Sequence, residues 1–319
     1  MSRYSETPLS FEGLKTVPIE ARGGKVRVED FARPYRKGGG AGAWLDSLPK
    51  ILAGDSLRGV VEALQRARLQ KRAILWGMGG HVVKCGLADV LLDLMRRGWI
   101  TGFVMNGAAS IHDFEIAIAG QTSEDVEAVL PDGRFGAAEE TGREMNLAIA
   151  EGDREELGMG EALGKRLETL AKPEFAPHSI LLEAYRAAIP VTVHVAVGTD
   201  TPHTHPAADA AAIGAATHRD FRLLCSLARG LDRGGVYLNV GSAVVLPEVF
   251  LKAVSVVRNL GHALAGFTTV NFDFLQHYRP KVNVVERPHA RSGGRGFAIT
   301  GHHELLLPLL AAILIELDD

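Results

Sequence analysis

Residues 73–120 read AILWGMGGHVVKCGLADVLLDLMRRGWITGFVMNGAASIHDFEIAIAG, and this stretch decides the fold. It twice places a short apolar run before a glycine-rich turn and a segment with helical spacing of its apolar residues. Glycine lets the backbone N–H groups of such a turn, and the start of the helix behind it, approach a phosphate at the carboxyl edge of a parallel sheet. The pattern predicts a nucleotide pocket built from two strand–turn–helix units.

The same glycines have a second interpretation, because plain strand-to-helix turns also favour glycine. The spacing is not GxGxxG, and no acidic residue ends the second predicted strand, where a dinucleotide-binding unit carries its ribose ligand. From these residues alone, a nucleotide site and simple turns are both open.

Strands and helices alternate along most of the chain. We predict strands at about 73–76, 101–105, 191–197, 236–240, 265–270 and 296–300. We predict helices at about 44–52, 56–69, 82–97, 107–118, 207–229, 247–260 and 302–317. The apolar runs AILW, VTVHVAV, VYLNV and FAIT lack strict polar alternation, as expected of strands buried on both faces. The pattern predicts an α/β fold with a doubly wound, mostly parallel sheet and helices on both faces.

The domain organisation follows from where the alternation starts. Residues 1–54 are expected to form an irregular lead-in that ends in a helix, and residues 55–319 a single domain. This domain carries an insert at about 122–188 that is rich in Glu and Ala and shows helical spacing. We expect the insert to pack over one side of the sheet.

The composition limits the classes of function. Of 319 residues, 46% are hydrophobic, and 35 basic residues stand against 38 acidic ones, so the chain has no charge excess for nucleic acid or an anionic membrane. No signal peptide and no membrane-spanning run are recognisable, and the two cysteines, Cys85 and Cys225, form no disulfide framework. A soluble cytoplasmic protein that acts on a small molecule is expected.

The ordered set of segments downstream resembles deoxyhypusine synthase. The set consists of the two glycine turns, the strand into GTD, and the segments VYLNVGSAVVLPEVF, FTTVNFDF and ITGHHELLLPLL, and it covers roughly residues 55–317. The resemblance implies a Rossmann-like, NAD-binding fold and a homotetramer with its sites at subunit interfaces. It also implies transfer of an aminobutyl group from spermidine through an imine on an active-site lysine.

The resemblance assigns cofactor contacts to four turns. The family's Thr-Ser-Asn turn falls on residues 79–81, its Thr-Ala-Gly-Gly turn on residues 106–109, its Thr-Asp pair on Thr199 and Asp200, and its late Asp turn near residues 300–302. The carboxylate of Asp200 can accept from ribose hydroxyls. The expected NAD contacts are therefore Gly77, Gly79, Gly80, His81, Asn106, Gly107, Ala108, Asp200 and Gly301.

The positions that bind the substrate in the resembling family depart from the family's pattern in this sequence. The family's paired Glu residues are replaced by Ile111 and His112, although the Asp that follows is retained as Asp113. The family's lysine lies in a Trp-Gly-Lys segment, whereas this chain reads ARSGGRGF there and has no Lys after Lys281. An arginine cannot replace it, because imine formation needs a neutral amine. Ordinary deoxyhypusine synthase activity is therefore not expected.

Histidines concentrate in the loop HVAVGTDTPHTHP, which follows a predicted strand and contains His194, His203 and His205. Two histidines separated by one residue can ligate one metal ion from an extended loop, so these three are candidate metal ligands. Histidine also serves as a general base or a hydrogen-bond donor. His112 occupies a position that faces the substrate in the resembling family, which favours an acid, base or orienting role.

Three functions stay open. The first is a deoxyhypusine-synthase-like NAD-binding enzyme that acts on a small amine or related substrate without a lysine imine. Its catalytic residues would be His112, Asp113, His203 and His205. The second is a metal-dependent hydrolase that uses the loop at 194–205, and the third is a non-catalytic nucleotide-binding protein.

Overall fold

Six strands form one parallel sheet in the computed structural model, which describes residues 3–318. The strands are β1 (Ile74–Met78), β2 (Gly102–Asn106), β3 (Val191–His194), β4 (Val236–Val240), β5 (Thr268–Asp273) and β6 (Arg295–Thr300). They lie in the order β3-β2-β1-β4-β5-β6, and every neighbouring pair is parallel, which confirms the predicted α/β class. The direction of winding changes between β1 and β4, and ligands of such sheets bind outside the carboxyl ends of the strands at that point.

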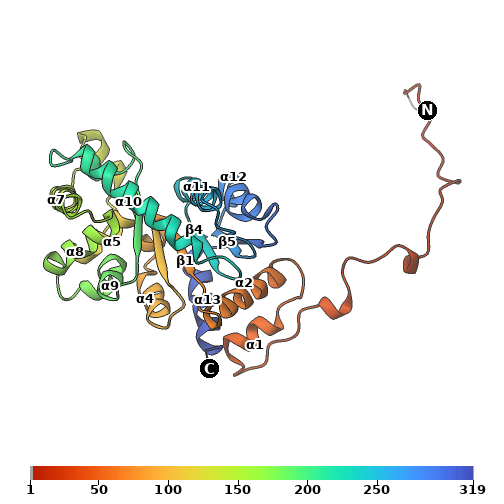
Figure 1. Ribbon diagram of the computed structural model, residues 1–319. Helices are drawn as coiled ribbons and strands as arrows, with labels where there is room; N and C mark the ends of the chain where they lie inside the picture. Colours follow the sequence, from red (N-terminus) through yellow and green to blue (C-terminus); the bar gives the residue numbers. More distant parts are fainter. Residues whose placement is uncertain (1–2, 319) are drawn as a thin grey trace.

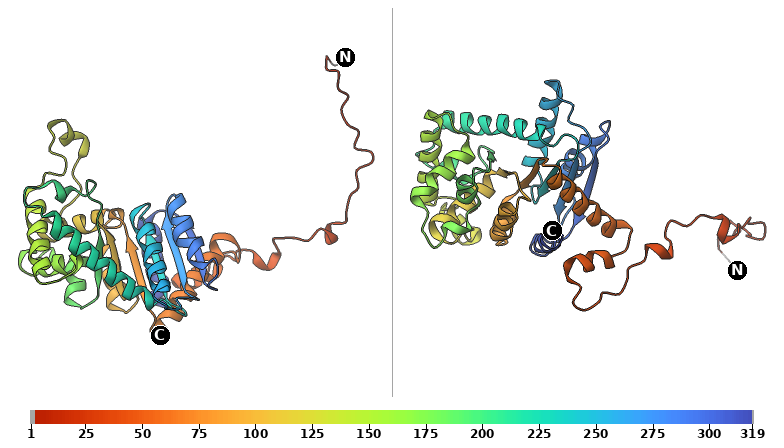
Figure 2. Two further views of the ribbon diagram at one scale, coloured as in Figure 1. Left: turned by 45° about the horizontal axis from the view of Figure 1, so that its top comes forward. Right: turned by 60° about the horizontal axis from the view of Figure 1, so that its bottom comes forward.

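Helices cover both faces of the sheet (Figures 1 and 2). One face carries α2 (Leu52–Leu69), α4 (Ala88–Arg96), α5 (Gly107–Ala119) and α13 (His303–Glu316), and the other carries α10 (Ala210–Arg229) and α11 (Val245–Asn259). Successive side chains of a strand alternate between the two faces, so Trp76 of β1 joins one core and its neighbour Leu75 the other. Burial on both sides is what the continuous apolar runs predict.

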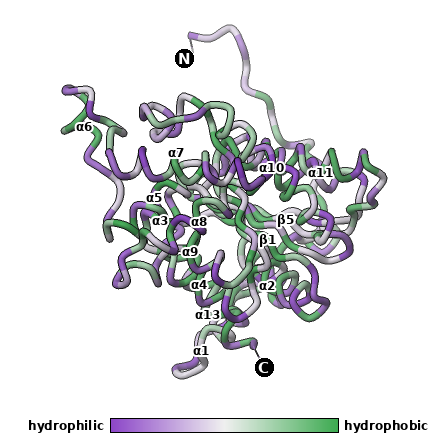
Figure 3. The backbone as a smooth tube through the Cα atoms, turned by 60° about the vertical axis from the view of Figure 1, so that its left-hand side comes forward, coloured by the Kyte–Doolittle hydropathy of each residue, from purple (hydrophilic) through white to green (hydrophobic). Residues whose placement is uncertain are grey.

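Residues 122–188 form a mainly helical lobe beside β3, the strand at one edge of the sheet (Figure 1). Its elements are α6 (Val126–Val129), η3 (Leu130–Asp132), α7 (Glu139–Arg154), α8 (Met159–Leu170), η4 (Ala176–His178) and α9 (Ile180–Arg186). The short α6 projects from the body of the protein (Figure 3). Buried carboxylates of Asp113 and Asp220 accept hydrogen bonds from backbone N–H groups at the starts of α9 and α8, which ties the lobe to α5 and α10.

The helix predicted at about 82–97 is wrong in one respect, because it is divided into α3 (Gly80–Lys84) and α4. The break follows from Gly86, whose φ of +73° lies in the left-handed region that ends a helix. The strand β3 also ends at His194, three residues before the predicted end. The loop that follows it is therefore longer than the sequence indicates, and it includes η5 (Thr201–Thr204).

The remaining short elements lie between β5 and β6. They are α12 (Tyr278–Pro280), the π-helical turn η6 (Lys281–Glu286) and η7 (Arg287–His289). This segment packs next to α11, and the carbonyl oxygen of Val284 accepts a hydrogen bond of 2.6 Å from the Thr269 hydroxyl of β5.

The chain before α1 (Gly40–Ser47) leaves the body as an extended arm with the turns η1 (Ile19–Ala21) and η2 (Val28–Asp30) (Figure 2). The helix α1 returns to the body, where the Gly42 N–H donates to Glu316 of α13 at 2.8 Å. The expected boundary at residues 54 and 55 falls inside α2. Within residues 3–318, no helix combines the length and the apolar character that a bilayer crossing requires.

Candidate functional site

The turns at the carboxyl ends of the strands bring together most of the residues that the sequence singles out. Because all six strands are parallel, the turns after β1, β2 and β4 and the start of α13 after β6 share one edge of the sheet. The turns after β1 and β4 meet at the point where the winding changes direction. A Cβ on Gly79 would lie 2.2 Å from the carbonyl oxygen of Gly241, so only glycine permits this close approach.

The first turn leaves the start of α3 open. Gly79 is the N-cap of this helix, and no side chain accepts a hydrogen bond from its first N–H groups. Gly80 follows, packed against Ala108 and the ring of His112. Gly77, which the sequence places in the turn, lies inside β1 instead. Its missing side chain leaves room for the hydroxyl of Tyr237, which would lie 2.5 Å from a Cβ there, so its glycine serves packing within the sheet.

The second turn is satisfied by the protein itself. Asn106 caps α5 by accepting from the Ala109 N–H at 2.9 Å. The carboxylate of Asp200 lies against Gly107, where a Cβ would be 2.0 Å from Oδ2, and Oδ2 also accepts from the Ala196 N–H at 2.7 Å. Burial raises the pKa of Asp200, although the backbone hydrogen bond and the nearby His203 act in the opposite direction. This carboxylate therefore takes the place beside the start of α5 that a ligand's phosphate would need.

His112 of α5 stands in a chain of hydrogen bonds that sets its tautomer. The Thr122 hydroxyl donates to Glu115, and the same oxygen lies 2.7 Å from Nδ1 of His112, so it accepts from an Nδ1–H group. Nε2 then carries the free lone pair. Burial raises the pKa of Glu115, but hydrogen bonds from His112, Thr122 and Thr141 outweigh it and hold this pKa below its usual value. The charged carboxylate can stabilise an imidazolium at His112.

Asp113 is enclosed and faces away from the sheet edge. It has no exposed surface, and it accepts from the Ser179 hydroxyl at 2.7 Å and from the N–H groups of Ile180 and Leu181 at 2.7 and 2.9 Å. Burial raises its pKa to about 6 despite these bonds. The expected catalytic role is corrected by this geometry, because the carboxylate caps α9 and is closed to a substrate.

The histidines of the loop after β3 do not gather. His194 is buried, its Nε2 lies 3.0 Å from the Thr192 hydroxyl, and burial lowers its pKa to about 4. His205 uses both ring nitrogens, because Nδ1 accepts from the Ala207 N–H and Nε2 lies 3.2 Å from Glu139. Nδ1 of His203 is buried without a partner in the described chain. Among residues 3–318 these three candidate metal ligands form no group of converging ligand atoms.

A different cluster lies at the same edge and was not predicted. Nε2 of His81 is 3.1 Å from Sγ of Cys85, which in turn is 3.7 Å from Oε2 of Glu304 in α13. Burial and then the neighbouring Glu304 raise the pKa of the Cys85 thiol, while Lys84 lowers it. The spacing of His81 and Cys85, four residues apart on one helix, is visible in the sequence. Glu304 is 219 residues further on and joins them only in the folded protein.

Two buried polar atoms near the switch point lack protein partners within residues 3–318. Nε2 of His303 donates to the Phe272 carbonyl at 3.1 Å, which leaves Nδ1 as an unpaired acceptor beside Gly241. Oδ1 of Asn239, in β4, is unpaired as well. Buried polar atoms usually have partners, so these two are unusual, and they lie at the switch point where ligands of such sheets bind. Gly301 lies nearby and donates its N–H to the Asp273 carbonyl at 3.1 Å.

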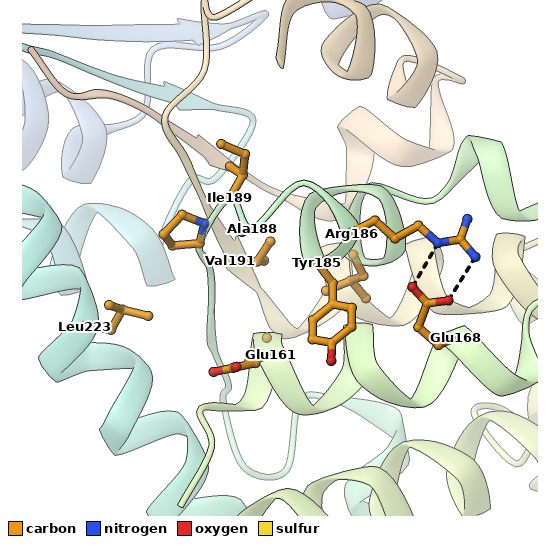
Figure 4. Close-up of a pocket in the computed structure, with 11 residues that line it drawn as sticks. Glu161, Glu168, Tyr185, Arg186, Ala188, Ile189, Val191 and Leu223 are labelled. Atoms are coloured by element: carbon orange, nitrogen blue, oxygen red, sulfur yellow. Dashed lines mark hydrogen bonds and ion pairs between the residues drawn. The ribbon is translucent and has the colours of Figure 1, made fainter. Parts of the chain in front are cut away.

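Two pockets flank the lobe. One of about 690 Å³ lies between α5, α7 and α8, and it is lined by Glu115 and Thr122 of the His112 chain together with Glu124, Glu140, Thr141 and Lys172. The other, of about 640 Å³, is shown in Figure 4. It lies near Pro190 at the amino end of β3, whereas the glycine turns follow the carboxyl ends of the strands. There Arg186 is already paired with Glu168 through two hydrogen bonds of 2.9 and 3.0 Å. The second pocket is therefore separate from the candidate site.

Comparison with known proteins finds similarity only among solved structures. No protein-family model matches the sequence, and no curated protein is significantly similar to it. Among solved structures, a "conserved putative LOR/SDH protein" from Methanococcus maripaludis S2 has a TM-score of 0.53 at 13% identity, covering 85% of this chain and 72% of that one. A "putative deoxyhypusine synthase" from Entamoeba histolytica has a TM-score of 0.52 at 11% identity, covering 90% and 97%.

A third similar structure is ArgZ, an arginine dihydrolase of the ornithine–ammonia cycle in cyanobacteria, with a TM-score of 0.51 at 17% identity. The match covers 84% of this chain but only 33% of ArgZ. At such identities the similarity concerns the fold. The chain shares a Rossmann-like α/β architecture with these enzymes, and its relation to the deoxyhypusine synthase structure is a distant one at the level of the fold.

Proposed function

We propose that the chain is an NAD-dependent enzyme, distantly related to deoxyhypusine synthase, that oxidises a small amine or a related substrate without a lysine imine. The observation that carries the proposal is the orientation of His112. Its Nδ1–H is held by Thr122, and its ring packs against Gly80 of the turn at the switch point. A base with a defined free lone pair thus stands beside the turn where a dinucleotide of this fold class binds.

The residues that would hold the dinucleotide are those of the first turn. No side chain caps the backbone N–H groups at the start of α3, which belong to residues 79–81. The unpaired acceptors of Asn239 and His303 lie at the same edge of the sheet. NAD, when bound, supplies a hydride acceptor. The second turn contributes Ala108, which packs against Gly80, and not a phosphate site, because Asn106 caps α5 and the Asp200 carboxylate occupies the space beside Gly107.

His112 performs the acid–base work in this proposal. Its Nε2 removes the proton that a substrate amine or alcohol releases as its carbon is oxidised. The imidazolium formed keeps its Nδ1–H on Thr122, and the Glu115 carboxylate behind Thr122 stabilises the positive charge. His203 is retained as a second candidate, because its buried Nδ1 is unpaired and it interacts with Asp200. His205 is proposed only as a positioning residue, since both its nitrogens are engaged.

A cationic amine suits the pocket next to His112. Four carboxylates line this pocket of about 690 Å³, whereas only two basic side chains, Arg143 and Lys172, do so. The family's imine chemistry has no counterpart here. Arg295, in the segment that replaces the lysine, begins β6 at the opposite edge of the sheet and lies over the ring of Phe297.

The proposal is tested with NAD itself. Calorimetric titration of the wild-type chain with NAD is expected to give a dissociation constant below about 1 mM. Formation of NADH from a panel of small amines is then followed by absorbance. His112→Asn should abolish turnover and leave NAD binding within a factor of about three, because the base is lost and the turn is kept. His262→Ala, at an exposed histidine outside the site, is the matched control and should change neither.

The alternatives are outcomes of the same experiment. NAD binding without oxidation of any amine would favour a non-catalytic nucleotide-binding protein. Failure to bind NAD below about 1 mM would overturn the proposal as a whole. A hydrolase that uses the loop at 194–205 lacks support, because the ligand atoms of its histidines do not converge within residues 3–318. We further propose that the enzyme acts in the cytoplasm, in keeping with the free thiols of Cys85 and Cys225, and that it assembles as a homotetramer.

A further inference from the structure

The cluster of His81, Cys85 and Glu304 combines three kinds of metal ligand in one place. Nε2 of His81, Sγ of Cys85 and a carboxylate oxygen of Glu304 all lie within 4.8 Å of one another, and the cluster is partly exposed. Among residues 3–318 it is the one group of three such ligands that converges. Its members come from α3 and from the first turn of α13, two separate elements of the carboxyl edge.

The distances agree with tetrahedral coordination. Zinc binds thiolate at about 2.3 Å, and imidazole and carboxylate at about 2.0–2.1 Å, so neighbouring ligand atoms of a tetrahedron are about 3.3–3.7 Å apart. The observed separations are 3.1 Å between Nε2 of His81 and Sγ, and 3.7 Å between Sγ and Oε2 of Glu304. Changes of side-chain torsion alone would close the difference.

The secondary structure explains why the ligands converge. Residues four apart on a helical turn share one face, and Cys85, the C-cap of α3, donates its N–H to the carbonyl oxygen of His81, so the two side chains lie together. The His81 ring contacts two other rings, with its centroid 5.4 Å from that of His303 and 6.0 Å from that of Phe274. Glu304 approaches from the start of α13, where the helix dipole favours a carboxylate.

We propose that His81, Cys85 and Glu304 bind a divalent transition metal ion of the Zn²⁺ type. The mixture of thiolate, imidazole and carboxylate is the donor set that such an ion prefers. His302 lies near the cluster, with its Nδ1 3.8 Å from Oε1 of Glu304. The metal would use the side chain of His81, whereas the proposed dinucleotide uses the backbone of the first turn, and no reaction is assigned to the metal site.

The same residues could be interpreted as a nucleophilic cysteine with a histidine base. The position of Glu304 argues against this, because a carboxylate beside the sulfur opposes the thiolate that a nucleophile requires. A dication resolves that conflict, since it stabilises the thiolate and the carboxylate together. The charge arrangement therefore favours a metal ligand over a nucleophile.

Cobalt(II) is the probe of choice, because a thiolate bound to it gives a charge-transfer band in the near ultraviolet. The reduced, EDTA-treated full chain is titrated with Co²⁺, and Zn²⁺ is then added to displace it. We expect one Co²⁺ per chain, with this band and the visible bands of tetrahedral cobalt. Binding weaker than about 1 mM, or a binding spectrum without the charge-transfer band, would overturn the proposal.

Two cysteines allow a matched control. Cys85→Ser should remove the charge-transfer band and weaken binding at least about tenfold, whereas Cys225→Ala, which removes the buried thiol of α10, should leave both unchanged. Glu304→Gln, at an exposed position, keeps the fold and should also weaken binding at least about tenfold. A band that survives Cys85→Ser, or affinity that Glu304→Gln leaves unchanged, would contradict the assignment. NAD titration of the same variants is a separate readout, so this site and the proposed function can fail independently.

Discussion

At the scale of single residues, glycine at the first turn is required by the approach of two backbones. A Cβ on Gly79 would lie 2.2 Å from the carbonyl oxygen of Gly241 and 2.9 Å from its carbonyl carbon, and backbone atoms cannot move aside as a side chain can. We therefore expect Gly79→Ala to lower the free energy of unfolding by about 1–3 kcal/mol, measured by urea denaturation.

The control for this substitution should change the free energy of unfolding in the opposite direction. Gly214 lies inside α10, and nothing comes within 4 Å of a Cβ placed there. Gly214→Ala should raise the free energy of unfolding by about 0.5–1 kcal/mol, because alanine favours the helix. Equal effects of the two substitutions would show that the contact with Gly241 does not matter. The comparison also explains a limit of sequence reasoning, because the sequence places Gly79 in a turn but does not show its contact with Gly241.

At the scale of elements, the buried Asp220 couples the stability of the fold to pH. It is fully buried in α10, and it accepts from the Gly160 N–H of α8 and the Val193 N–H of β3 at 2.9 and 2.7 Å. Burial outweighs these bonds and raises its pKa to about 7. Between about pH 4 and about pH 7 the folded chain therefore keeps a proton that the unfolded chain releases, so stability falls as the pH rises through this window.

Asp220→Asn should remove that contribution. From about pH 4.5 to about pH 6.5, the free energy of unfolding of the variant should fall less steeply than that of the wild type, by about 1.4 kcal/mol per pH unit. Urea denaturation at several pH values measures the two slopes. Asp46→Asn, at an exposed aspartate, should give the wild-type slope. Parallel slopes for Asp220→Asn and the wild type would contradict the assignment.

An element could be predicted well where the residues that determine it are close together in the sequence. The strand at 236–240 was predicted at its observed bounds, because a short apolar run between a glycine pair and a glycine turn needs no distant information. The division of the helix predicted at about 82–97 was missed, since glycine inside an apolar periodic segment also occurs in continuous helices. The role of Asp113 was missed because its partners, at the start of α9, lie 66–68 residues further along the chain.

At the scale of the whole molecule, the doubly wound topology could be predicted, and the grouping of side chains at its edge only in part. His112 was expected to face a substrate, and the structure places its ring against Gly80 of the first turn, because a parallel sheet brings the ends of its strands together. The loop histidines were candidate metal ligands, and their ligand atoms do not converge, because closeness in sequence does not fix the direction of a ring. The cluster with Glu304 depends on how the start of α13 lies against the end of α3. No local sequence pattern reveals that arrangement.

The extended arm raises the last question at this scale, which is what covers its apolar side chains. Leu9, Phe11, Leu14 and Ile19 are each more than 70% exposed, and the arm runs away from the body of the chain (Figure 2). Burial of each such side chain is worth about 1.5–3 kcal/mol, which favours docking on another copy in the proposed homotetramer. Sedimentation velocity should therefore find the wild-type chain as an oligomer.

The double substitution Phe11→Glu and Leu14→Glu should shift this equilibrium toward smaller species, because charges on the arm oppose its burial. Ser5→Glu with Thr7→Glu adds the same charge to the same arm at polar positions, so it separates loss of apolar contact from simple repulsion and should leave the oligomer largely intact. Both double variants should keep the wild-type circular dichroism spectrum, since the arm packs on none of the strands. A wild-type chain that sediments as a monomer up to about 100 μM would contradict both the homotetramer and this role of the arm.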